Sequence, residues 1–421
     1  MVLLAASIFI VGYVLISAEH KLQVSKSAIA MLFAGILWVL IAANDRANVP
    51  IHLSEAGAEI FEILVFLLSA MTLVEILVHY KFFDIVRSWI ASKSLSVVQQ
   101  LWIISGFAFV LSAVIDNLTT TIVLSQLSRL FFKGKNLIIA AAVVVVSANA
   151  GGAFSPIGDV TTTMLWLQGK FASSEVILYG FVPSLVTYIV AASLMIIRAN
   201  SGEERFSGIA NPTLLWSEKL VIGFVFGSFT LPFVFHSFGL RPYMGLLTGL
   251  GLTWFLVDLL KKQLPDHQSH FTASIERLLQ RTDISSLKFF VGILLAVAAL
   301  NHLGILEELS NILFGDGPGL SRFVAGSAVM GAFSAIVDNV PLTAAAMDIV
   351  RTTDSSIWVL IALTVGTGGS MLVIGSAAGV VAMGIVKELN FVNYLKIAGL
   401  PAALGYVFGI GAWYLERLLL F

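Results

Sequence analysis

Apolar stretches of about 20 residues recur along the whole chain, and the polar segments between them are too short to fold as soluble domains. Hydrophobic residues make up 58% of the 421 residues and charged residues only 12%, whereas soluble domains carry roughly 25% charged residues. The sequence therefore predicts an all-α polytopic membrane protein whose main partner is the lipid bilayer. The predicted spans are 2–18, 27–43, 57–79, 175–197, 220–238, 243–260, 287–304 and 395–415, with an amphipathic interfacial helix at 81–93.

Charge and cysteine content exclude several classes of function. The 24 basic and 25 acidic residues nearly cancel, so no nucleic-acid partner is indicated. The chain has no cysteine, which excludes disulfides, thiolate metal sites and cysteine catalysis. Its seven histidines show no metal-binding spacing, and its aspartates lack the Tyr-Asp or Gly-x-Gly-Asp context of intramembrane proteases. We expect no cofactor and no enzymatic activity.

An Asp-Asn pair occurs twice inside apolar sequence, in SAVIDNLTTT (112–121) and in SAIVDNVPLT (334–343). An ionised side chain in lipid costs several kcal/mol unless it faces water or a partner, so an intramembrane acid indicates a functional site. The alternative is that each pair only caps the start of a helix. The repetition favours function, and we predict helical hairpins at 97–132 and 322–350 with these pairs at their tips.

Two further segments interrupt apolar helices. ANAGGAFSPIGD divides a helix predicted at 137–168, and GTGGSMLVIGSAAG divides one predicted at 357–386. Glycine and proline break a helix at membrane depth only where the freed backbone faces protein or a wet cavity. Both segments are therefore predicted to be discontinuous helices.

The two halves of the chain align element for element. The offset between matched residues drifts only from 226 to 217, which indicates a duplication with small insertions and deletions. We predict a first repeat at 1–198, a polar linker at 199–219 and a second repeat at 220–421. The matched pairs are Glu75 with Asn301, Asp116 with Asp338, and Gly158 with Gly375.

Basic residues indicate the orientation. If both hairpins turn back inside the membrane, each half crosses five times and the two repeats are inverted. This topology places 18 of the 24 Lys and Arg residues in cytoplasmic loops, whereas counting the hairpins as full crossings leaves 10 inside and 14 outside. The sequence thus predicts re-entrant hairpins, both termini outside, a cytoplasmic linker at 199–219 and a bacterial-type inner membrane. Hairpins and broken helices in inverted repeats are typical of secondary transporters.

Several segments resemble NhaD-type sodium/proton antiporters of the ion-transporter superfamily, over nearly the whole chain. They are AMTLVEIL (70–77), SAVIDNLTTTIVL (112–124), SANAGGAFSPIGDVTTTMLW (147–166), FFVGILLAVAAL (289–300) and DNVPLTAAAM (338–347). The resemblance implies exchange of sodium or lithium for protons, an inverted-repeat fold and a homodimer with an elevator-like movement. An anion or oxyanion carrier on the same scaffold, for a dicarboxylate or arsenite, is the alternative.

Sodium needs several oxygen ligands, which a membrane site supplies from carboxylates, hydroxyls, amides and unwound carbonyls. Both hairpins and both breaks carry such groups, and no obvious intramembrane Lys or Arg accompanies them, which favours a cation over an anion. The candidates in the first half are Asp116, Asn117, Thr119, Thr120, Ser147, Asn149, Ser155, Asp159, Thr161 and Thr162. Those in the second half are Asp338, Asn339, Thr343, Thr364, Thr367, Ser370 and Ser376.

Asp159 is the first candidate for the exchanging carboxylate, because its counterpart in the second half is the uncharged Ser376. Asp116 follows, and Asp338 is third. For Asp159 and Asp338 the alternative is again a helix cap. We expect the sodium ion to contact Asp116, Asn117, Asn149 and Asp159.

Glu62 and Glu75 lie 13 residues apart in the third predicted span and therefore on different helical faces. Each is a candidate for a proton relay, and for Glu75 a snorkelling or structural role is the alternative.

Overall fold

The computed structural model is helical, with no strand among the residues that it describes. These are residues 2–17, 23–43, 46, 49–92, 95–200, 214–263, 278, 282, 284–306, 308, 312, 314 and 319–420. Six of the helical segments are long and apolar enough to cross a membrane. The prediction of an all-α polytopic membrane protein is confirmed. Most of the predicted linker 199–219 and the ends of several loops lie outside the described residues.

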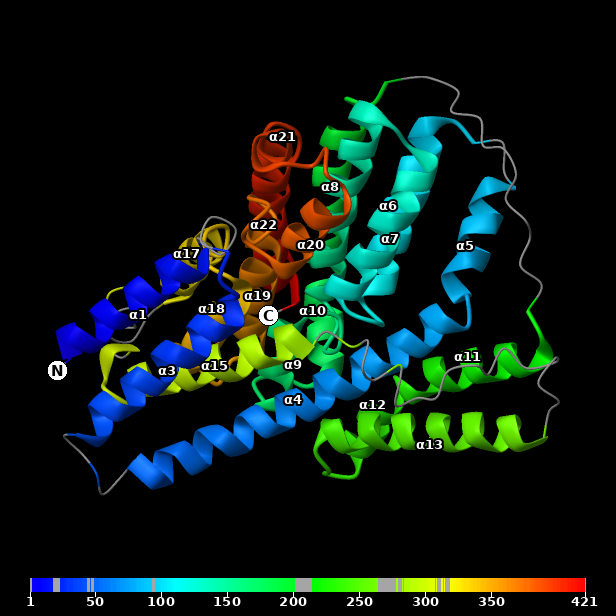
Figure 1. Ribbon diagram of the computed structural model, residues 1–421. Helices are drawn as coiled ribbons and strands as arrows, with labels where there is room; N and C mark the ends of the chain where they lie inside the picture. The colour runs from blue at the N-terminus through cyan, green and yellow to red at the C-terminus, as the bar shows by residue number, and fades with distance from the viewer. Residues whose placement is uncertain are drawn as a thin grey trace.

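The N-terminal half begins with two single helices and a long one, and ends with a hairpin, a broken helix and a final span (Figure 1). The elements are α1 (Val2–Ser17), α3 (Lys26–Ala42), α4 (Val49–His79), α5 (Phe82–Ala91), α6 (Val97–Ser112), α7 (Asn117–Phe131), α8 (Gly134–Gly152), α9 (Val160–Leu167) and α10 (Ser173–Ile196).

The C-terminal half follows the same order from its third span onward. Its elements are α11 (Trp216–Ser228), α12 (Leu231–Ser237), α13 (Pro242–Gln263), α15 (Ile284–His302), α17 (Leu320–Phe333), α18 (Asn339–Ile349), α19 (Ser355–Gly368), α20 (Ala377–Ile385), α21 (Phe391–Tyr394), η2 (Leu395–Gly399) and α22 (Leu400–Leu420).

Three predicted spans differ most from the helices of the structure. The helix α4 begins at Val49 rather than at 57, because the polar residues before 57 continue the helix instead of ending it. The span predicted at 220–238 is two helices, since Pro232 opens α12 after a break at Phe229 and Thr230. The last span, predicted at 395–415, starts at Phe391 and passes through a π-helical turn before α22.

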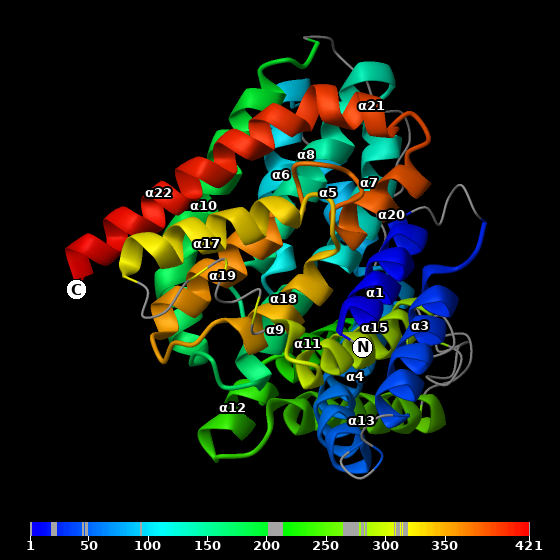
Figure 2. The same cartoon turned by 90° about the vertical axis from the view of Figure 1, so that its left-hand side faces the viewer.

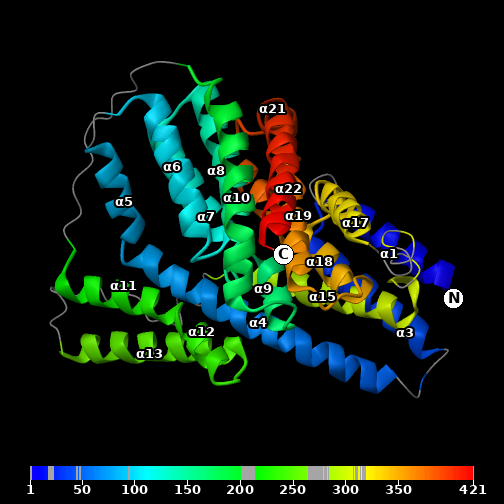
Figure 3. The same cartoon turned by 180° about the vertical axis from the view of Figure 1, so that it is seen from behind.

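Helices from the two halves pack directly on one another. The helices α10 and α22 lie side by side, as Figures 1 and 3 show. The helix α3 lies against α15, where the indole N–H of Trp38 donates to the carbonyl of Leu295 at 2.9 Å. Gly292 has no side chain to separate these two helices, since a Cβ there would lie 2.6 Å from the backbone nitrogen of Met31. Residues of both halves therefore pack together in the hydrophobic clusters of the protein.

The hairpins and the broken helices meet in the middle of the molecule (Figure 2). The short helix α9 of the first half packs on α18 of the second, and α20 of the second half packs on α7 of the first. This packing of each half's broken helix on the other half's hairpin brings the hairpin tips close to the breaks at 153–159 and 369–376.

Equivalent hydrogen bonds from a serine hydroxyl to a backbone carbonyl occur in both halves. The hydroxyl of Ser112 donates to the carbonyl of Ala148 at 2.6 Å, and the hydroxyl of Ser334 donates to the carbonyl of Val365 at 2.7 Å. The donors are 222 residues apart and the acceptors 217, the same offsets as those of the aligned motifs. Each helix before a break also has a glycine against a hairpin carbonyl, with Gly151 at Phe109 and Gly368 at Gly331.

Candidate functional site

The first break is built from small residues. The helix α8 ends at Gly152, where a Cβ would lie 2.5 Å from the carbonyl oxygen of Gly158, so the chain folds closely back on itself. The helix α9 then begins at Val160 with Asp159 as its N-cap. Because the helix continues to Gly152, Asn149 lies in its last turn rather than within the break that the sequence predicted.

Asp159 is buried, with 1% of its surface exposed. Its Oδ1 accepts a hydrogen bond from the backbone N–H of Thr161 at 3.2 Å. The side-chain amide of Asn339 donates to both carboxylate oxygens, each at 3.4 Å. The carboxylate therefore caps α9 and also contacts the tip of the other half's hairpin.

Asp116 occupies a strained position at the tip of the first hairpin. Its φ of 143° lies in a region that favours glycine. Its Oδ1 accepts from the backbone N–H of Thr119 and its Oδ2 from the hydroxyl of the same residue, both at 2.7 Å. Asp116 thus caps α7 with Oδ1, and both of its carboxylate oxygens have a partner in Thr119.

Asp338 lies at the tip of the second hairpin and is half-buried. Its Oδ1 accepts from the backbone N–H of Val340 at 3.2 Å, which makes it the N-cap of α18. Its own backbone N–H donates to the hydroxyl of Tyr13 on α1 at 2.6 Å. Capping geometry is therefore present at all three aspartates.

The three aspartates line one small cavity of about 40 Å³, between α4, α15 and the two hairpin tips. Asn117 and Asn339 line it too, and its described lining includes no lysine or arginine. Within the described parts of the chain, however, no three acidic or histidine side chains lie close enough to hold a metal ion together. A cation here would need amide, hydroxyl or carbonyl oxygens in addition to carboxylate oxygens.

Asn149 joins the first hairpin to the second break. Its Oδ1 accepts from the side-chain amide of Asn117 at 3.0 Å. Its Nδ2 donates to the hydroxyls of Ser370 at 2.8 Å and Ser376 at 3.0 Å. The side chain is fully buried, and these bonds use both ends of its amide.

The predicted hydroxyl ligands fall into two groups. In the described structure, the buried hydroxyls of Thr120, Ser147 and Thr161 have no hydrogen-bond partner. Such a group is costly unless something else, such as water or an ion, pairs with it. The other predicted hydroxyls have partners. Thr119 donates to Asp116, and Ser370 and Ser376 accept from Asn149. The remaining five donate to backbone carbonyls: Ser155 to Ala113, Thr162 to Gly152, Thr343 to Asn339, Thr364 to Ile361 and Thr367 to Leu363.

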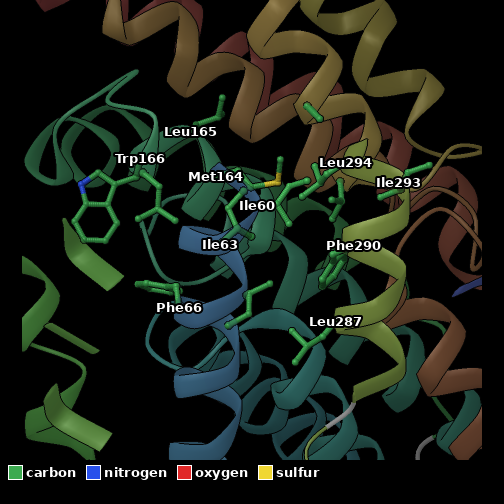
Figure 4. Packing of buried hydrophobic residues seen from close by; sticks show 14 of the residues in the cluster. Ile60, Ile63, Phe66, Met164, Leu165, Trp166, Leu287, Phe290, Ile293 and Leu294 are labelled. Carbon is green, nitrogen blue, oxygen red and sulfur yellow. The ribbon is translucent and has the colours of Figure 1, made fainter. Parts of the chain in front are cut away.

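A larger cavity of about 600 Å³ lies along the same helices as the small one. On α4, residues up to Ile63 line the large cavity and residues from Phe66 onward line the small one. On α15, Leu294 lines the large cavity and Phe290 the small one. Figure 4 shows Ile63 of α4, Met164 of α9 and Leu294 of α15 in one apolar cluster, and these three side chains line the large cavity.

The large cavity carries charged residues that the sequence analysis did not select. Glu55 and Glu59 of α4, Asp348 of α18 and Lys170 line it. The Lys170 ammonium also lies over the ring of Trp358, 4.6 Å from the ring centroid. Glu59 lies about one helical turn before Ile63 and Glu55 about two turns before it, so both share its cavity-lining face. A helix predicted to begin at Val49 would have shown this pattern.

The two predicted relay residues do not line either cavity. Glu62 pairs with the Nε of Arg241 at 3.3 Å. Glu75 is half-buried further along α4. By contrast Asn301, the counterpart of Glu75, lines the large cavity.

Apolar spanning helices, two breaks and a buried acidic cavity define an integral membrane transporter. Residues 2–366 match the CitMHS family, described as citrate transporters. Sodium/proton antiporter 1 of Arabidopsis thaliana is 40% identical over 97% of this chain and 71% of its own length. Sodium/proton antiporter 2 of the same plant is 38% identical, over 96% of this chain and 97% of its own length. The Na(+)/H(+) antiporter NhaD of Alkalimonas amylolytica is 31% identical over 96% and 88%.

The chain therefore belongs to the CitMHS family of membrane transporters and, through these relatives, to its NhaD-type sodium/proton antiporters.

Proposed function

We propose that the protein exchanges sodium or lithium ions for protons across a membrane. The observation that carries this proposal is the small cavity, which is lined by Asp116, Asp159 and Asp338 and by no basic residue among those described. An anion carrier would need positive charge or free N–H groups at this place, whereas the N-terminal N–H groups of α7, α9 and α18 are already capped by these aspartates.

Asp159 is the carboxylate at which cation and proton compete. A carboxyl group withdrawn from water holds a proton more readily, and a bound cation displaces that proton. Asp159 is the most enclosed of the three aspartates, and it adjoins the unpartnered hydroxyl of Thr161. Asp116 is the second candidate. Asn117 follows Asp116 in the chain, and Asn149 bonds to Asn117 and to Ser370, which holds the first hairpin to the broken helices.

The architecture proposed for this exchange is a pair of inverted repeats, 1–198 and 220–421, with re-entrant hairpins. The hydrogen bonds that recur at offsets of 222 and 217 support the duplication. The excess of basic residues at one set of loops supports termini outside and linker 199–219 in the cytoplasm of a bacterial-type cell. In that orientation the large cavity opens outward. A homodimer with an elevator-like movement completes the proposal.

Dye dequenching in everted membrane vesicles tests the function. Vesicles acidified by respiration should lose their pH gradient when sodium or lithium is added, and Asp159→Asn should abolish that response. Asp84→Asn, on the exposed face of α5, is the matched control and should respond as the wild type does. An unchanged response in both Asp159→Asn and Asp116→Asn would sink the assignment.

A further inference from the structure

The helix α19 has no side chain where it passes Asp159. A methyl group on Gly366 would lie 3.4 Å from Oδ2 of Asp159, 3.6 Å from the hydroxyl oxygen of Thr161 and 3.7 Å from Cβ of Ala153. These are ordinary van der Waals distances, so a gap about as large as a methyl group adjoins the carboxylate. The hydroxyl of Thr161 borders this gap, is fully buried and lies beside the carboxylate of Asp159 without a well-formed hydrogen bond to it.

The matching place in the other half is filled by an amide. Asn149 stands 217 residues before Gly366, and its amide nitrogen donates to Ser370 and Ser376. Those two serines stand 217 residues after Ala153 and Asp159, the residues that face Gly366. One half therefore has an asparagine between two hydroxyls, and the other has a glycine beside a carboxylate.

The two places need different partners. The hydroxyls of Ser370 and Ser376 are neutral, and the amide hydrogens of Asn149 satisfy them. The carboxylate of Asp159 is buried, and a buried charge is costly unless an opposite charge or good hydrogen bonds compensate it. Asn339 reaches it only at 3.4 Å, and the Thr161 amide at 3.2 Å. A small cation in the gap would supply the missing positive charge.

We propose that the transported cation binds between Asp159 Oδ2 and Thr161 Oγ1 against the backbone of Gly366, and that the amide of Asn149 permanently fills the equivalent place in the other half, so that each chain holds one cation rather than two. This inference rests on the proposed function and adds to it the location and number of the sites. Gly366 is then a specificity-determining residue, because the missing side chain sets the size of the site.

Equilibrium binding of radioactive sodium to the purified full-length chain tests this site, with unlabelled lithium as competitor. The wild type should bind one sodium ion per chain. Gly366→Ala should weaken sodium binding about tenfold, because one methyl group then occupies the gap, and should weaken lithium binding less, because lithium is smaller. Gly384→Ala is the matched control, since no atom lies within 4 Å of a Cβ at that exposed helical position.

Several results would overturn the inference while leaving the proposed function intact. One is the binding of two sodium ions per chain by the wild type. Another is a loss of affinity of less than threefold for both sodium and lithium in Gly366→Ala. A Gly366→Ala protein that does not fold, judged by gel filtration and thermal unfolding beside Gly384→Ala, would show that the gap is closed and would also overturn it. Absence of sodium and lithium binding in the folded wild type would overturn the proposed function and this inference together.

Discussion

The side-chain amide of Asn339 donates to both carboxylate oxygens of Asp159, and this contact joins the hairpin of one half to the broken helix of the other. Both side chains are buried, with 4% and 1% of their surfaces exposed. Each partner also marks a helix start, since Asn339 opens α18 and Asp159 caps α9. The carboxylate proposed to exchange its ion is thus positioned by a residue 180 positions away in the sequence.

Asn339→Ala removes this amide and should weaken cation binding without unfolding the protein. A hydrogen bond to a charged group is worth about 1.5–3 kcal/mol, and since these two are long we expect the lower limit, about a tenfold rise in the KM for sodium. Initial rates of sodium-driven proton movement in vesicles measure this. Asn393→Ala, at a position that lines neither cavity, should leave the KM unchanged. An equal KM in the two variants would contradict a positioning role for Asn339.

Asp116→Asn removes the negative charge of this side chain but keeps its ability to cap α7. Asparagine is as good an N-cap as aspartate, so its side-chain oxygen can still accept the N–H of Thr119 and thermal stability should change little. The negative charge is lost, and we expect sodium-driven exchange to fall by at least about tenfold if that charge contributes as little as 1.4 kcal/mol. Unfolding temperature and exchange rate are measured on the same preparation. Full exchange with unchanged stability would show that Asp116 acts only as a cap.

Gly151→Ala and Gly368→Ala should destabilise the protein by the same mechanism. In each case the new methyl group meets a hairpin carbonyl, that of Phe109 or of Gly331, at far less than contact distance. Backbone cannot move aside as a flexible side chain does, so we expect a loss of about 1–3 kcal/mol or more in each. Thermal unfolding of the purified variants beside Gly384→Ala measures it. Wild-type stability in either variant would remove the support that these contacts give to the duplication.

Ala298 of α15 lines the large cavity, so a cysteine at this position tests whether the cavity is open to water. The natural chain contains no cysteine, so single cysteines can be introduced without altering other positions. Ala298→Cys should react with a charged, membrane-impermeant thiol reagent added outside intact cells. Ala296→Cys, on the buried face of the same helix, should not react. Reaction of Ala298→Cys only in everted vesicles would reverse the proposed orientation.

Helix type and order could be predicted from the sequence because lipid demands long apolar stretches with satisfied backbones. Glycines predicted both breaks, with a proline in the first, and the paired Asp-Asn motifs predicted both hairpin tips. Helix ends were less predictable. Glu55 and Glu59 were missed because polar residues near a helix start resemble a loop until a neighbouring helix gives them a cavity to line.

The partners of each site residue could not be predicted, because they come from the opposite half. No spacing within the sequence indicates that Asn149 meets Ser370 and Ser376, or that Asn339 meets Asp159. Glycine gives no chemical signal at all, so the gap at Gly366 became visible only when α19 was placed against the first break.

The central claim is that a cation and a proton compete for Asp159, and the most direct test is proton release when sodium binds. Purified protein in weakly buffered detergent solution is titrated with sodium chloride between about pH 6 and 9, and the change in pH is recorded. Because binding a cation to a protonated carboxyl releases its proton, the wild type should release up to about one proton per sodium ion bound, and Asp159→Asn should release none. Sodium binding to the wild type without proton release across this range would contradict the account.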